Sequence, residues 1–119
     1  MKNIHSTSLE SISINGTSHE VEITVSYEVD DWDTDDWRDE IRGKLERGEA
    51  ISSVVNVTAT LVHGGAIFEG HDDLGGCIIE RHSDVTSKVA DYDMIRTAID
   101  DLMSEMTQKR AALNSIFGN

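Results

Sequence analysis

The sequence contains no proline and one cysteine, Cys77, among its 119 residues. One thiol cannot form an internal disulfide, so folding does not require an oxidising compartment. The beginning of the chain has no apolar run of signal-peptide length, and no stretch approaches the roughly 20 apolar residues that span a bilayer. These absences predict a soluble protein in the cytoplasm of the host cell.

Basic residues are scarce: 10 lysines and arginines stand against 23 aspartates and glutamates, giving a formal charge of -13. Such a charge argues against direct binding to nucleic acid or to an anionic membrane, since both are densely negative. It favours a basic protein partner, a cation or solubility alone. The length and the 38% apolar content predict one folded domain over residues 1–119.

A β-hairpin is predicted near the start of the chain. Asn15-Gly16 is a favoured pair for a two-residue turn, because both residues tolerate positive φ. Pairing around this turn sets Ile14 opposite Thr17 and Glu10 opposite Val21. Apolar residues then alternate with polar ones as far as Val29, which predicts a strand with one buried face.

The stretch VDDWDTDDWRDE, residues 29–40, holds seven carboxylates and two tryptophans. Asp33 is suited to cap a helix, and on that register Trp32 and Trp37 have the spacing of a hydrophobic staple. Trp37, Ile41 and Leu45 recur at helical spacing, and Gly48 is the predicted end. Acids near a helix start are stabilised by the helix dipole, which explains part of the stretch.

The second half predicts further strands and a long helix. Residues 55–62 alternate as a strand, and AIFE (66–69) and CIIE (77–80) are predicted as two short strands around the loop GHDDLGG. Ser83 or Asp84 is predicted to cap one helix that ends at Gly118. Its apolar stripe comprises Tyr92, Ile95, Ile99, Leu102, Met106, Leu113 and Ile116. The expected fold is α+β, with the order β-β-α-β-β-β-α and an antiparallel sheet packed by one short and one long C-terminal helix.

Three kinds of chemistry were weighed against structural explanations. Asp31, Asp33, Asp35 and Asp39 occupy positions 1, 3, 5 and 9 of a calcium-loop frame, but Asp36 and Arg42 stand where glycine and glutamate are required. His63, His71, Cys77 and His82 have metal-ligand types without the tight ligand spacings. Cys77 is a candidate nucleophile, and the alternative is that it is a small core residue beside Ile78. No catalytic motif is present, so we expect no enzyme activity, cofactor or metal.

The acids themselves are the main functional clue. Residues 28–40 carry a net charge of -7, and a second acidic group follows the long helix. Glu20, Glu22 and Glu28 fall on the polar face of the second strand, about 7 Å apart for alternate residues. The candidate partner-binding residues are Glu28, Asp30, Asp31, Trp32, Asp33, Asp35, Asp36 and Asp39, with Trp32 as the anchor unless the staple buries it.

In size and charge the chain resembles small acidic inhibitors of phages and mobile elements, including nucleic-acid mimics and anti-CRISPR proteins. The resemblance implies a protein that blocks the basic nucleic-acid-binding surface of a host defence nuclease or CRISPR effector. An immunity protein or secretion-type chaperone for one cognate protein, or a small viral assembly protein, stays an alternative. A homodimer through the helix Tyr92–Ile116, and a merely solubilising or halophilic charge, also stay open.

Overall fold

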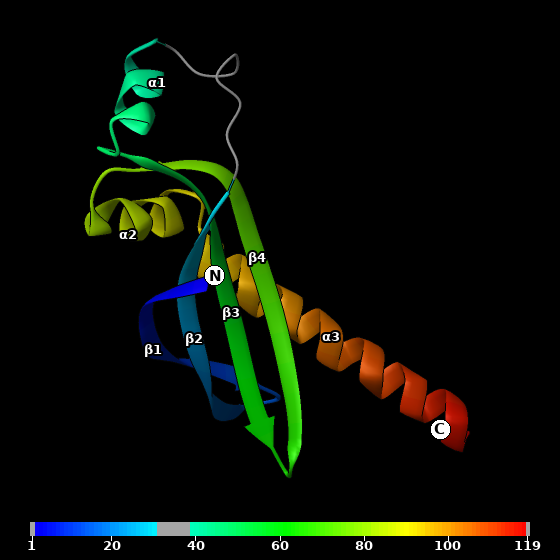
Figure 1. The fold of residues 1–119 in the computed structure, drawn as a ribbon. Helices are drawn as coiled ribbons and strands as arrows, with labels where there is room; N and C mark the ends of the chain where they lie inside the picture. The colour runs from blue at the N-terminus through cyan, green and yellow to red at the C-terminus, as the bar shows by residue number, and fades with distance from the viewer. Residues whose placement is uncertain (1, 31–38, 119) are drawn as a thin grey trace.

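The computed structural model describes residues 2–30 and 39–118. The elements are β1 (Lys2–Ile14), β2 (Thr17–Val29), α1 (Asp39–Glu46), β3 (Ile51–His63), β4 (Ala66–Ile79), α2 (His82–Asp91) and α3 (Met94–Phe117). The strands form one antiparallel sheet in the order β1-β2-β3-β4. Helices α2 and α3 lie on one side of this sheet, and α1 stands beyond one end (Figure 1). The predicted α+β class with an antiparallel sheet is confirmed.

Two-residue turns set the register of both hairpins. Asn15 and Gly16 adopt φ of 50° and 81°, and Gly64 and Gly65 adopt 58° and 81°. Positive φ at both central positions is the type I′ pattern, whose twist matches that of the flanking strands. The predicted pairs Ile14–Thr17 and Glu10–Val21 are confirmed.

The core lies between the sheet and the two C-terminal helices. Alternate residues of β2 and β3 point into it and are at most 5% exposed, and the helices contribute residues that recur every three or four positions. The cluster comprises Val21, Ile23, Val25, Val55, Val57, Ala59, Leu61, Cys77, Ile79, Val85, Val89, Met94, Ala98 and Leu102.

The two short strands predicted around GHDDLGG are wrong, because β4 runs unbroken from Ala66 to Ile79. Gly70 lies inside this strand, where a Cβ would meet the backbone of Ala98 and Leu102. Glycine therefore lets α3 approach the strand closely. Gly75 and Gly76 coincide with the register shift between Ser53 and Val55, so they accommodate a bulge and do not end the strand.

The single long helix predicted after Ser83 is also wrong. Helix α2 begins at His82, and the Asp84 carboxylate accepts the backbone N–H groups of Glu80 and Arg81 at 2.8 and 3.1 Å. This contact lowers the pKa of Asp84, because N–H donors stabilise its charged form. The helix ends before Asp93, whose φ of 50° is left-handed, and α3 then starts in a new direction. Aspartate is one of the few side chains that tolerate this conformation.

Helix α3 packs against the edge strand β4 and then leaves the sheet (Figure 1). The Glu105 and Asp101 carboxylates accept the backbone N–H groups of Glu69 and His71 at 2.6 and 2.8 Å. These acids satisfy outward-facing donors of the edge strand, which would otherwise be available to another chain. The predicted stripe is buried only in its middle: Leu102 is inaccessible, whereas Tyr92 is 57% exposed and all of residues 107–118 are exposed.

Candidate functional site: the open face of the sheet

The sheet has a second face, opposite the core and the helices α2 and α3. We call it the open face. It is formed by alternate residues of the strands, and its charged members are Lys2 on β1, which pairs with Glu28, then Glu20, Glu22 and Glu28 on β2, and Glu69, His71 and Asp73 on β4. All seven of these side chains are exposed. The predicted placement of the three β2 glutamates, opposite the apolar face of their strand, is confirmed.

Register arranges the open-face acids in two rows. Glu22 pairs with Thr60, which pairs with Glu69, so these acids flank a neutral residue of β3. Asp73 has no acid opposite it, because its partner Asn56 pairs with the neutral Ser26 of β2. Acids of one row repeat about every 7 Å or a multiple of it, and the two rows are about 10 Å apart. The open face therefore carries five carboxylates on one sheet, and the exposed apolar side chains of Ile4, Leu9, Val62 and Ile67 lie on the same face.

The centre of the open face is polar but not charged. Asn56 is 8% exposed, and its amide nitrogen has no hydrogen-bond partner among the described residues. Thr58 contacts Nδ1 of His71 at 3.2 Å, and Nε2 of His71 lies 3.5 Å from Glu69. His71 is thus held within the acidic row by the strand residues beside it.

The predicted partner-binding residues are only partly described. Glu28 is exposed near the end of β2. Asp30 follows it and is tied to β3, because its carboxylate accepts from Ser52 Oγ at 2.6 Å and its N–H donates to the Ser52 carbonyl at 3.1 Å. Asp39 is the first residue of α1.

The rest of the acidic stretch lies outside the described residues. This applies to Asp31, Trp32, Asp33, Asp35 and Asp36, and with them to the predicted cap, the staple and most of the calcium-loop frame. The helix that follows is described: α1 ends at Glu46, Leu45 is 8% exposed, and Gly48 adopts φ of 74° as a helix-ending glycine does. Lys44 of α1 binds Glu80 at 2.9 Å, and this contact raises the pKa of the lysine.

The other candidate sites do not assemble. Within residues 2–30 and 39–118, no group of three or more histidine, cysteine, aspartate or glutamate side chains is arranged to hold a metal. Cys77 is 3% exposed, and its thiol donates to the Leu74 carbonyl at 3.3 Å. Burial raises the pKa of this thiol, which disfavours the nucleophilic thiolate. Cys77 is a core residue.

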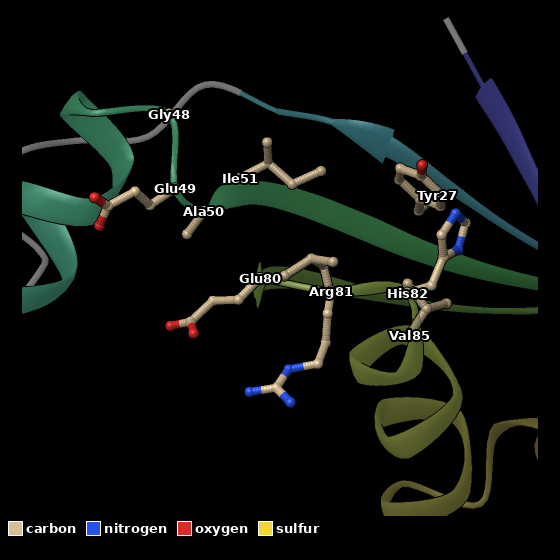
Figure 2. A pocket seen from close by; sticks show the side chains of 10 residues that line it. Tyr27, Gly48, Glu49, Ala50, Ile51, Glu80, Arg81, His82 and Val85 are labelled. Carbon is tan, nitrogen blue, oxygen red and sulfur yellow. The ribbon is translucent and has the colours of Figure 1, made fainter.

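A cavity of ≈ 200 Å³ lies between the end of the sheet and α2, lined in part by Tyr27, Glu80 and His82 (Figure 2). It is smaller than the roughly 300–1,000 Å³ of most small-molecule sites, whereas a cavity of ≈ 510 Å³ beside Asp30, Leu45 and Ser52 falls within that range. None of the described helices is both long and apolar enough to cross a membrane.

Comparison with protein-family models, with curated proteins and with solved structures finds no significant match to this chain.

Sequence reasoning found the β2 acids and missed those of β4. The segment from Glu69 to Asp73 was predicted as mostly loop, yet the Gly64-Gly65 pair is a turn signal of the same kind as Asn15-Gly16. Counting the register from that turn would have set Glu69 opposite Thr60. The edge-capping role of Asp101 and Glu105 has no sequence signal, because it depends on where α3 meets β4.

Proposed function

We propose that this protein is a small acidic binding protein, not an enzyme, that docks onto a basic surface of a nucleic-acid-binding partner and excludes the nucleic acid. The supporting observation is the open face, where carboxylates of β2 and β4 stand exposed in two rows on one rigid sheet. Glu20 and Glu22, as alternate residues of β2, are about 7 Å apart, which is close to every second phosphate of a DNA strand, whose charges advance about 3.4 Å along the helix axis.

The chain's charge supports the same proposal. A net charge of -13 on 119 residues accelerates encounter with a basic surface, while a few buried contacts hold the complex. In the sequence, the acidic stretch 29–40 follows directly on Glu28 and holds seven carboxylates, Asp30 among them. By its resemblance in size and charge to phage-encoded inhibitors, the partner we expect is a host defence nuclease or CRISPR effector.

Recovery of the partner tests this proposal. Tagged protein is incubated with native host lysate and washed at about 0.1 M and about 1 M salt, between which the screening length falls from about 10 Å to about 3 Å. We expect a nucleic-acid-binding complex that is lost at high salt and displaced by added DNA or RNA. A partner that survives high salt and ignores nucleic acid would contradict the proposal.

Charge-neutralising variants then test which part of the acidic surface binds the partner. Changing Asp30, Asp31, Asp35 and Asp36 to asparagine removes four charges from the stretch between β2 and α1. We expect weaker inhibition of the recovered complex, with circular dichroism unchanged. Full inhibition by a folded variant would show that this stretch is not part of the binding surface.

The described end of α3 favours a second candidate, a chaperone or immunity protein that holds one cognate protein through apolar contacts. Leu113, Ile116 and Phe117 are 55%, 73% and 72% exposed on the part of α3 beyond the sheet. The same residues would serve a homodimer, for which light scattering is the direct test. Both alternatives predict binding that changes little with salt, because apolar contacts are not screened.

A further inference from the structure

Two histidines from distant parts of the chain meet at the outer edge of the sheet. His5 of β1 and His82, the first residue of α2, have ring centroids 5.3 Å apart and ring planes inclined by 31°. Their Nδ1 atoms are 3.2 Å apart. His82 belongs to the metal-type residues noted in the sequence, but its neighbour in space is His5 and not Cys77 or His63.

The outer nitrogen of His5 is held by a third residue. Nε2 of His5 lies 2.9 Å from Thr86 Oγ1, one helical turn after His82. When Nε2–H donates to this hydroxyl, Nδ1 of His5 keeps its lone pair and faces His82. Metal-binding histidines are commonly oriented in this way by a hydrogen bond from the second ring nitrogen.

The surroundings of the two rings differ. His5 is half-buried, with its Nε2 against Thr86 of α2. His82 is exposed, which leaves room for water. Figure 2 shows the His82 ring beside Tyr27, with the Arg81 guanidinium pointing away from it.

The separation of the two nitrogens fits one metal ion. Zinc binds imidazole nitrogen at about 2.0–2.1 Å, so two ligands at a tetrahedral angle have nitrogens about 3.3 Å apart. We propose that His5 and His82 form a binding site for zinc or another imidazole-seeking metal such as nickel or copper, with water completing the coordination. Binding requires His82 to move its proton from Nδ1 to Nε2, and no net proton is lost.

A metal at this site would tie the edge strand β1 to α2. These elements are far apart in sequence, and His5 joins them through its polar contacts with His82 and Thr86. A ligand that binds only the folded state stabilises it, so zinc is expected to raise the melting temperature. The site is independent of the open face, and its test says nothing against the proposed function.

The test is a calorimetric titration of the metal-free protein with zinc chloride, which measures affinity and stoichiometry. The melting temperature is then measured with and without zinc. We expect one zinc per chain and binding at least tenfold weaker in each of the single variants His5→Asn and His82→Asn. The matched controls are His19→Asn and His63→Asn, a second histidine pair whose ring centroids are 5.6 Å apart and whose rings meet edge to face at 84°. The controls should bind zinc like the unmodified protein.

A second readout does not depend on the variants folding. In the unmodified protein, NMR signals of the His5 and His82 imidazoles should be the first to shift with zinc, and calcium chloride should not compete. Absence of zinc binding, equal binding by all four variants, or displacement by calcium would overturn the proposal. The last two results would assign the zinc to the acidic surface.

Discussion

Gly70 is the residue on which the packing of α3 against the sheet most depends. A Cβ at this position would lie 2.7 Å from Leu102 Cα, and closer still to the Ala98 carbonyl oxygen and the Leu102 amide nitrogen. Ordinary contact begins at 3.4 Å, so α3 would have to retreat by at least 0.7 Å. All three obstructing atoms belong to the backbone, and no side-chain rotation can relieve the clash.

This geometry sets the expected effect of Gly70→Ala. Overpacking costs about 1–3 kcal/mol, and we expect the upper end, about 3 kcal/mol, because the helix moves as a unit. The movement would also loosen Met94, Ala98 and Leu102, which are fully buried. A domain of this size has about 5–15 kcal/mol of stability in all, so the loss would be large.

Urea unfolding followed by circular dichroism measures the effect, as a fall in the midpoint of about 1 M or more. The matched control is Gly75→Ala on the same strand, where a Cβ meets nothing within 4 Å. We expect the control to be unchanged or up to about 1 kcal/mol more stable. Equal stability of the two variants, or a loss below about 0.5 kcal/mol for Gly70→Ala, would refute the close approach of α3.

Two further predictions concern buried groups of the core. Burial raises the pKa of Cys77, so the unfolded chain ionises first as pH rises above the ordinary value of 9.0, and stability should fall there. Between about pH 8 and pH 10, the unfolding free energy should fall less in Cys77→Ala than in the unmodified protein. An equal fall in both proteins would contradict a raised pKa for the Cys77 thiol. Ser53 is fully buried, with no partner for its hydroxyl in the described part of the chain. Ser53→Ala should therefore be neutral or about 1 kcal/mol more stable by thermal unfolding, and a loss of similar size would indicate a bonded hydroxyl.

The N-terminal hairpin could be predicted because several local preferences agree. The Asn15-Gly16 turn, the alternation of β2 and the pairing of Glu10 with Val21 all specify one register, and a slip of one residue would bury Glu22 in place of Ile23. The placement of the β2 acids on the open face followed from the same alternation.

The second half was harder to predict because its signals depend on tertiary contacts. Glycine usually ends a strand, yet Gly70 continues one, since α3 approaches at that point. The break before Asp93 has no proline or glycine to mark it, and the break lets α3 turn along β4. The role of Asp101 also depends on a tertiary contact, because its carboxylate accepts the backbone N–H of His71 on the edge strand β4.

The central claim is that the open face binds a basic partner, and matched charge variants test it most directly. Glu20, Glu22 and Glu28 are changed together to glutamine, and Asp91, Asp93 and Asp100, which lie on the helical layer, are changed together to asparagine. Each variant loses three negative charges, so net charge is equal. The measurement is the affinity of each for the recovered partner at about 0.1 M salt. We predict about tenfold weaker binding for the open-face variant and little change for the helix variant, while equal affinities would contradict the account.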